Sequence, residues 1–434
     1  MTTEGKTREI SVDYLARVEG EGAMYLKLDG DEILDLEFSI FEPPRFYEAF
    51  LVGRKPSEAP DITSRICGIC PIAYQMSAIN AMEFASGTHV HPQIRALRRM
   101  LYAGEWIESH ALHVYMLHAP DFLGYESAIE LAADMPDVVT NALRLKKLGN
   151  TVMTLIGGRE IHPINMRVGG FYRTPTRREL DALVEELEWA LETSEATVRL
   201  VSTFEFPEFD MPYEFVALRH PDEYPITDGR IVSSEGLDID VSEWNEHFEE
   251  IHVERSNALH VKHRERGTFH VGPMARFTIN HDKLTPRARA VADEVGLERG
   301  ERNPFRSIIV RSVELVLACE EILRLIDDYE RPPEPWIPVE PSDGVGHGVS
   351  EAPRGLLYHR YEIDADGLIA DAQIVPPTAQ NQRSIEADLR EFVLPRTQME
   401  DDKLKWQLEQ AIRNYDPCIS CATHFLDLKV DRVN

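Results

Sequence analysis

The chain has 434 residues, with 75 Asp or Glu against 46 Lys or Arg, so its formal net charge is −29. A surface this acidic repels phosphates, which argues against a nucleic-acid partner. The longest apolar run, residues 307–326, contains Arg311, Glu314, Glu320 and Glu321 and therefore predicts a buried helix and no membrane span. The N-terminus shows no apolar signal segment and no twin arginine, so we expect a cytoplasmic protein.

The N-terminal region predicts β-structure, because residues 11–42 contain alternating stretches and a DGDE turn. A short helix over 44–54 follows, and a longer helix is predicted from Pro71 onward, since proline suits a first helical turn. The middle of the chain predicts long helices with apolar residues at helical spacing: 94–120, 127–158, 177–204 and 303–330. The predicted fold class is α+β, a large helical core with β-hairpins at its edges.

Residues 207–268 mix short β-like runs with turns and predict an insertion on the helical core. Residues 332–348 are rich in Pro and Gly and predict a loop, while 356–375 predict a second hairpin around a DADG turn. A last helix over 399–415 leads into a cysteine motif. The chain has no glycine-rich phosphate-binding motif, so we do not expect it to bind a nucleotide itself. We expect one large domain over 1–434.

Four of the five cysteines form two Cys-x-x-Cys pairs, Cys67 with Cys70 and Cys418 with Cys421, and Cys319 stands alone. Thiolates select soft metals, so two converging pairs predict a metal site, for which structural zinc is the ordinary interpretation. The pairs are 348 positions apart in the sequence, much farther than in a zinc ribbon. The alternative is a buried catalytic metal, with one pair supplied from each end of the fold.

Charged residues stand inside apolar or turn-forming motifs near these pairs: Glu19, Asp121, Arg354 and Asp416. A buried charge must be paired or must act in chemistry. Taken singly, each predicts a structural ion pair. Together, beside four thiolates, they predict a shell that handles protons.

The motifs RICGIC and DPCISCATH resemble those of the large subunit of nickel–iron hydrogenases. The resemblance spans the chain, because RVEGEG, RFYEAFLVGR, GEWIESHALHVYMLHAPD, GGREIHP and EAPRG fit that family in the same order. The cytoplasmic, NAD(P)-linked branch of bifunctional or sulfhydrogenase type looks closest, on CGICPIAYQ and VPPTAQNQ. The resemblance implies a single catalytic domain with the hydrogenase large-subunit fold.

The resemblance also implies the ligands of a nickel–iron centre. Cys67 and Cys418 would be terminal nickel ligands, and Cys70 and Cys421 would bridge nickel to an iron that carries CN and CO. A magnesium, or a similar ion such as Fe²⁺, would lie nearby. The implied ligands of this ion are Glu48, His424 and the carbonyl of Gln373.

The residues implied for proton transfer surround that centre. Arg354 and Pro353 would lie over the iron, with Asp121 and Asp416 orienting the arginine, and Glu19 would carry protons outward. A guanidinium stays protonated, so Cys418 is the favoured base and Arg354 an electrostatic gate.

Two further residues are noted here: Tyr74 departs from the family's pattern, and His162 can be interpreted in two ways. Tyr74 stands where many respiratory members have a histidine, which removes an expected hydrogen bond to Cys70. A hydrogen bond from an imidazole to a ligand sulfur tunes the redox potential of the metal, so the potential of this enzyme should not be inferred from the respiratory branch. His162 is as readily structural as functional.

The implied activity is reversible heterolytic cleavage of H2 to protons and electrons. The chain lacks cysteines for iron–sulfur clusters, so an iron–sulfur small subunit and a flavin subunit that reduces NAD(P) are implied partners. Maturation by a nickel chaperone and a protease is also implied, with removal of residues 425–434. The alternatives are a deazaflavin-linked or membrane-bound hydrogen-evolving subunit, a metal-free relative from complex I, and a four-cysteine zinc protein.

Overall fold

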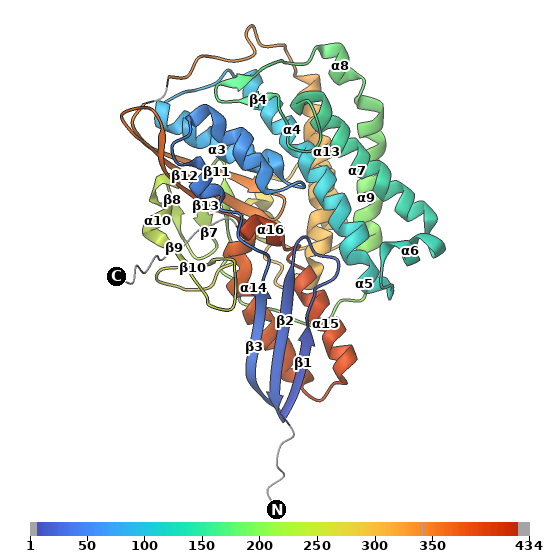
Figure 1. Ribbon diagram of the computed structural model, residues 1–434. Helices are drawn as coiled ribbons and strands as arrows, with labels where there is room; N and C mark the ends of the chain where they lie inside the picture. The colour runs from blue at the N-terminus through green and yellow to red at the C-terminus, as the bar shows by residue number, and fades with distance from the viewer. Residues whose placement is uncertain (1–6, 341, 424–434) are drawn as a thin grey trace, which may run out of the picture.

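The computed structural model describes residues 7–340 and 342–423 (Figure 1). Four long helices pack against one another on one side of the molecule, which confirms the predicted helical core. They are α4 (Pro92–Ala111), α7 (Pro136–Gly157), α9 (Val184–Val201) and α13 (Ser307–Asp327). α13 is buried along nearly its whole length, as its interrupted apolar run predicts. Its buried charged residues Arg311, Glu314 and Glu321 have partners inside the protein.

A three-stranded antiparallel sheet projects from the body at the lower end of Figure 1. It consists of β1 (Thr7–Val12), β2 (Gly22–Asp29) and β3 (Glu32–Ile40). α15 (Asp401–Arg413) packs against β1, and α14 (Pro377–Val393) packs against β3. The predicted N-terminal hairpin is β2–β3, and β1 adds a third strand to it.

A second three-stranded sheet lies in the body and carries α3 (Pro71–Ser86) on one face. Its strands are β11 (Gly344–Ala352), β12 (Gly355–Ile363) and β13 (Ile369–Val375). The predicted hairpin is β12–β13. The prediction of a loop through residue 348 is wrong, because residues 344–352 pair with β12 along their whole length.

Residues 207–268 contain short strands in two small sheets. The strands are β6 (Val216–Arg219), β7 (Arg230–Ser233), β8 (Asp238–Ile239), β9 (Phe248–Ile251) and β10 (His260–His263). Their apolar side chains share one buried cluster with those of β1–β3 and α14. The β-content of this region is confirmed, and its status as an insertion stays a prediction.

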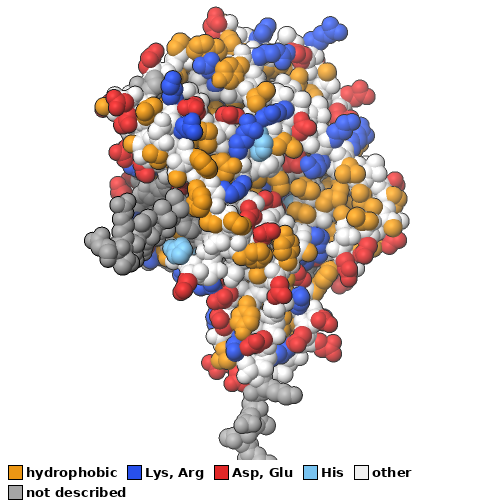
Figure 2. All heavy atoms as spheres, viewed as in Figure 1, with side chains coloured by type: hydrophobic (Ala, Val, Ile, Leu, Met, Phe, Trp, Pro, Cys, Tyr) orange, Lys and Arg blue, Asp and Glu red, His pale blue; other side chains and the backbone are white. Residues whose placement is uncertain are grey.

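The remaining helices and strands are short connections around this frame. They are α1 (Tyr47–Leu51), α2 (Ala59–Thr63), α5 (Ala119–Leu123), α6 (Ala128–Asp134), α8 (Arg177–Asp181), α10 (Trp244–His247), α11 (Pro273–Asn280), α12 (Pro286–Glu294), α16 (Ile419–Ala422), β4 (Met166–Arg167) and β5 (Gly170–Phe171). A π-helical turn, Leu112–His118, continues α4. Within the described ranges, no helix has the length and apolar character to cross a bilayer. Figure 2 shows acidic and basic side chains interspersed over one face.

Candidate metal centre

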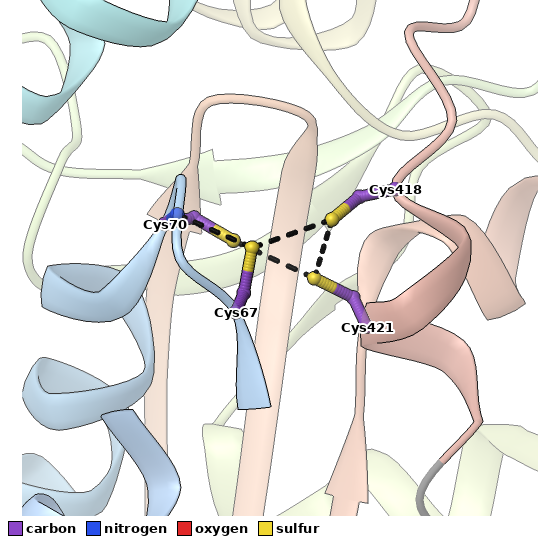
Figure 3. Close-up of side chains that lie close together, drawn as sticks. All are labelled: Cys67, Cys70, Cys418 and Cys421. Atoms are coloured by element: carbon purple, nitrogen blue, oxygen red, sulfur yellow. Dashed lines mark hydrogen bonds between the residues drawn. The ribbon is translucent and has the colours of Figure 1, made fainter. Parts of the chain in front are cut away.

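The two cysteine pairs meet in the interior. The Sγ atoms of Cys67 and Cys418 are 3.5 Å apart, and those of Cys70 and Cys421 are 3.6 Å apart. All four sulfur atoms lie within 4.8 Å of one another, and all four residues are buried. Figure 3 shows the sulfur atoms pointing toward a common centre, one pair from the segment before α3 and the other from the segment at α16.

The first pair is placed by the start of α3. Cys70 is the residue before the helix and Pro71 opens it, as the sequence predicts. The backbone N–H groups of Ile69 and Cys70 donate to the Cys67 sulfur at 3.3 and 3.4 Å. Glu105 on α4 accepts the N–H groups of Ile72 and Ala73 at 2.6 and 3.2 Å. A buried carboxylate therefore caps the helix that carries this pair.

The second pair lies at a helix of only four residues, α16: Cys418 is the residue before it and Cys421 lies within it, and neighbouring residues hold both. The Cys418 N–H donates to Thr378 Oγ1 at 3.0 Å. The Ile419 N–H donates to the Glu19 carbonyl at 2.9 Å, so that Glu19 and Cys418 form a parallel β-bridge. Sequence analysis missed Thr378 and Glu105, because each contacts a segment far away in the chain.

Four thiols in one buried pocket form a ligand set for a metal. Burial raises the pKa of Cys418, and a hydrogen bond with Cys418 lowers the pKa of Cys67. Four thiolates this close repel one another, and a cation between them removes that repulsion. The residues present therefore fit a soft-metal centre, with these sulfur atoms as the ligands.

A small cavity adjoins three of these sulfur atoms, those of Cys70, Cys418 and Cys421. Its other lining residues are Tyr74, Ala352, Pro353, Arg354, Leu357 and Pro377. The lining is mainly apolar, with one charged group. Space for small molecules therefore lies directly beside the cysteines.

Arg354 is buried over this cavity and is fixed by Asp416. Its Nε donates to the Asp416 carbonyl at 2.7 Å and its Nη2 to Asp416 Oδ1 at 3.1 Å. Its Nη1 lies 3.5 Å from Ser109 Oγ, a contact that the sequence analysis missed. Burial lowers the pKa of Arg354, but the charges of Asp416 and the cysteines outweigh it and hold that pKa above its usual value. The predicted pairing of Arg354 with Asp416 is therefore present.

Asp121 has a different role from the one expected. Its carboxylate accepts Nε and Nη2 of Arg413 at 2.7 and 2.8 Å, and it also pairs with Arg17. The expectation that Asp121 directly orients Arg354 is wrong, because these two arginines, from α15 and the N-terminal segment, take up its oxygens. Asp121 instead ties the end of α15 to the body, next to the segment that carries Asp416.

Glu19 reaches the second cysteine pair. Its Oε2 accepts the Cys418 thiol at 3.1 Å and the Ser420 N–H at 3.1 Å. Burial raises the pKa of Glu19. A carboxyl group with a raised pKa, in contact with a thiol, is suited to take up and release a proton.

Glu48 and Gln373 lie together beside a second acid. Glu48 Oε1 accepts the Ile374 N–H at 2.7 Å, and the Gln373 side-chain amide donates to Glu250 Oε2 at 2.7 Å. Burial raises the pKa of Glu48 to about 8 and that of Glu250 to about 7, and the Glu250 charge adds to the shift at Glu48. Sequence reasoning missed Glu250, one of many acids in 207–268. The expected third ligand, His424, lies outside the described residues.

The two remaining residues singled out from the sequence make structural contacts. The Tyr74 hydroxyl donates to the Cys421 carbonyl at 3.4 Å, so it bonds the backbone of the second pair. His162 Nδ1 lies 2.8 Å from the Ser64 carbonyl and has a φ of +50°. His162 therefore holds a turn just before Cys67.

Comparison with known proteins places this geometry in a family. The family model for nickel-dependent hydrogenases matches residues 45–139 and 264–424. Sulfhydrogenase 1 subunit alpha of Pyrococcus furiosus is 34% identical over 96% of this chain and 98% of its own. NAD-reducing hydrogenase HoxS subunit beta of Cupriavidus necator is 27% identical over 97% of this chain and 95% of its own.

A solved structure has the same fold. The crystal structure of an NAD⁺-reducing [NiFe]-hydrogenase in the H2-reduced state aligns with a TM-score of 0.87 at 28% identity. The alignment covers 97% of this chain and 100% of that one. With the four cysteines brought together as the motifs predict, the chain belongs to the nickel-dependent hydrogenases, as a large, catalytic subunit with the cysteine ligands of a nickel–iron centre.

Proposed function

We propose that Cys418, Glu19 and Arg354 carry out the proton chemistry of reversible H2 cleavage. The observation that carries this proposal is the 3.1 Å contact from the Cys418 sulfur to Glu19 Oε2, beside a buried arginine. When bound, nickel and iron supply the Lewis acidity that polarises H2. The Cys418 sulfur takes the proton and Glu19 passes it outward. Arg354 supplies a fixed positive charge over the cavity.

The metal content of the protein tests whether the four cysteines hold a nickel–iron centre. We propose that the iron carries CN and CO, as the likeness to nickel-dependent hydrogenases implies. Elemental analysis of the active protein should find nickel and iron, and its infrared spectrum should show CN and CO stretches. Zinc alone, without these stretches, would reject the proposal.

We propose that electrons leave through an iron–sulfur small subunit to a flavin subunit that reduces NAD(P). Besides the four cysteines of the site, only Cys319 remains, and its burial raises its pKa to about 12, so it is poorly suited to bind a cluster. The relatives named sulfhydrogenase and NAD-reducing hydrogenase support this acceptor. NAD(P) is a cytoplasmic cofactor, so we place the enzyme in the cytoplasm.

The test of the acceptor uses the complex purified from its native cells under H2. NAD⁺, NADP⁺ and a deazaflavin are offered in separate assays, with a viologen dye as the control for active enzyme. Reduction of NAD⁺ or NADP⁺ is the expected result. Reduction of the deazaflavin alone would favour a deazaflavin-linked hydrogenase subunit. Recovery of activity only with the membrane fraction would favour a membrane-bound hydrogen-evolving subunit.

We propose a magnesium, or Fe²⁺, bound by Glu48, the Gln373 carbonyl and His424. Two half-buried carboxylates with raised pKa values, those of Glu48 and Glu250, support it, because a cation would relieve the cost of ionising them. Glu48→Gln should lower the content of this ion. Glu249→Gln is the matched control, since Glu249 pairs with Lys262 near the surface. Equal ion content in the two variants would contradict the site.

We propose that a maturation protease, acting after a nickel chaperone, removes residues 425–434. These residues lie outside the described part of the chain. The support is the position of Cys421 on α16, whose Sγ lies 3.6 Å from that of Cys70 in the interior, so the C-terminal segment must enter the fold to complete the site. Intact-mass spectrometry of the nickel-loaded protein should give a chain that ends at His424. A mass that includes Asn434 would show that the site closes without cleavage.

A further inference from the structure

The turn that carries Arg354 has an unusual construction. Ala352 pairs with Gly355, so β11 and β12 are joined by a two-residue turn, Pro353–Arg354. Two-residue hairpin turns favour residues with positive φ, whereas proline fixes a negative φ and Arg354 has no positive φ. The turn therefore does not have the backbone geometry that suits a hairpin, and support from outside the hairpin is needed to hold it.

A second buried arginine supplies that support. Arg276 on α11 is 0% exposed. Its Nη1 donates to the Ala352 carbonyl at 2.7 Å and its Nη2 to the Pro353 carbonyl at 2.9 Å. These are the two carbonyl groups directly before Arg354. Arg276 thus grips the backbone of the turn, while the Arg354 side chain faces the cysteine cavity.

The remaining donors of Arg276 are anchored to the body of the protein. Nε and Nη2 bind Glu314 Oε1 and Oε2 at 2.8 and 2.7 Å, and Nη1 also binds Glu351 Oε2 at 3.1 Å. A guanidinium has five N–H groups, so each has an acceptor here. The guanidinium carbon lies 4.4 Å from the centre of the Trp106 ring, a cation–π distance.

Glu314 is itself fixed on α13. The Tyr224 hydroxyl donates to its Oε1 at 2.9 Å, and His110 Nε2 lies 2.9 Å from its Oε2. Burial alone would raise the pKa of Glu314, but the charge of Arg276 lowers it to about 2. The helical core and the Arg354 turn are therefore joined through one charged pair, in which no oxygen of Glu314 lacks a partner.

The residue directly before α11, Gly272, also lies against the turn. A Cβ at Gly272 would lie 2.7 Å from the Arg354 carbonyl oxygen. Gly272 has a φ of +117°, which favours glycine on its own account. Both the backbone before α11 and the side chain of Arg276 therefore contact the turn around Arg354.

We propose that Arg276 is a positioning residue for hydrogenase catalysis, which holds the Pro353–Arg354 turn so that the Arg354 guanidinium stays over the cysteine cavity. The inference rests on the proposed role of Arg354 and adds the group that places it. An ordinary buried ion pair would also stabilise the fold. A positioning role has a further consequence, since its effect on turnover depends on Arg354 being present.

The test compares Arg276→Lys with a matched control, Arg98→Lys, in the complete hydrogenase complex. Arg98 is also buried and also binds both oxygens of one carboxylate, Glu83, but it lies away from the turn. Lysine cannot reproduce the five-donor fork. Arg276→Lys should lower turnover by about 10- to 10²-fold, on the scale of small misplacements of a reacting group. Arg98→Lys should leave turnover unchanged, and both variants should keep their nickel.

A double-mutant cycle separates positioning from stability. With Arg354→Lys already present, Arg276→Lys should change turnover by about 2-fold or less, because the group that it places is gone. Amide hydrogen exchange of residues 344–363 should quicken in Arg276→Lys and stay as in the wild type in Arg98→Lys. Losses that multiply in the double variant would overturn the positioning role.

Two further outcomes are distinguishable. If Arg354→Lys alone leaves turnover unchanged, the proposed role of Arg354 fails, and this inference fails with it. If only Arg354→Lys lowers turnover, the role of Arg354 stands and that of Arg276 fails. Should Arg276→Lys lose its nickel, the milder Glu351→Gln, which removes one charge beside Arg276, takes its place in the cycle. An unchanged turnover in Glu351→Gln, with unchanged exchange of the turn, would then count against the proposal.

Discussion

The two cysteine pairs have the same spacing and face one centre, but they are supported in different ways. Cys67 and Cys70 precede the 16-residue helix α3, whose first N–H groups are capped by Glu105. Cys418 precedes a four-residue helix and Cys421 lies within it, and this segment depends on side chains from elsewhere, among them Glu19. The difference indicates that the first pair is a preformed half-site, and that the second is assembled by contacts made across the fold.

The largest expected effect is loss of a sulfur ligand from the assembled half. Cys421→Ser should abolish H2 oxidation and impair metal retention, because this sulfur serves both metals in the proposed centre. Nickel analysis and H2-dependent dye reduction check this. Cys319→Ser is the control, since Cys319 is buried away from the site and should keep both properties. Near-normal nickel and activity in Cys421→Ser would reject the ligand assignment.

The next effect concerns the charge over the cavity. Arg354→Lys keeps a positive charge but loses the planar fork that binds Asp416 through two atoms. Turnover should fall by about 10²-fold, the scale for losing one preorganised electrostatic group. The infrared bands of the centre should remain. Turnover at the wild-type rate in Arg354→Lys would show that the site does not need Arg354 as an electrostatic gate.

Glu19 distinguishes support from proton transfer within the assembled half. Glutamine can still accept the Ser420 N–H through its carbonyl oxygen, but it cannot carry a proton. Glu19→Gln should therefore keep its nickel and slow both turnover and proton–deuteron exchange, by about 10-fold or more. Exchange with solvent measured by mass spectrometry checks this. A wild-type exchange rate would mean that protons leave by another path.

A matched pair of variants tests the comparison directly. Thr378→Val leaves the buried Cys418 N–H without its acceptor, and Glu105→Gln leaves at most one good acceptor for Ile72 and Ala73. Each should cost about 1–3 kcal/mol of stability, as for an unpaired buried donor. Only Thr378→Val should lower nickel content, because α3 holds the first pair by itself. Equal nickel content would show that the halves do not differ in this way.

The smallest effect is a pH dependence of stability beside the assembled half. Tyr415, next to Asp416, donates to Asp388 Oδ2 at 2.7 Å, and burial raises the pKa of Asp388 to about 7. Since the folded state holds this proton more tightly, its contribution is complete below about pH 4 and is lost as the pH rises to about 7. Asp388→Asn removes this titration. Its Tm relative to wild type should rise between about pH 4 and pH 7, and a constant difference over that range would contradict the assignment.

Much of the fold could be predicted from helical spacing and end signals, but one strand was hidden by its composition. The glycines of residues 344–348 predict a loop, but these residues form the first half of β11. A Cβ at Gly346 would lie 2.2 Å from the Ala81 carbonyl oxygen, and one at Gly348 would lie 2.0 Å from that of Ser77. These glycines let the strand approach α3 closely, so the same residues that predict a loop are what the packing requires.

Some residues of the candidate site could likewise be predicted from the sequence, and others could not. The cysteines and Arg354 lie in short motifs that indicate their chemistry, so these residues could be predicted from the sequence. Asp121 was assigned wrongly because its partners, Arg17 and Arg413, come from opposite ends of the chain and no local pattern joins them. Glu250 and Arg276 were missed for a related reason. Each acts through a backbone or side chain that only the folded chain brings near.

The bridge between Glu19 and Cys418 has a consequence for biosynthesis. The ribosome makes Glu19 and the first cysteine pair long before it makes Cys418 and Cys421. A centre that needs all four sulfur atoms cannot close until the second pair has left the exit tunnel. Until then the nascent protein has half of its ligands available to any soft metal in the cell.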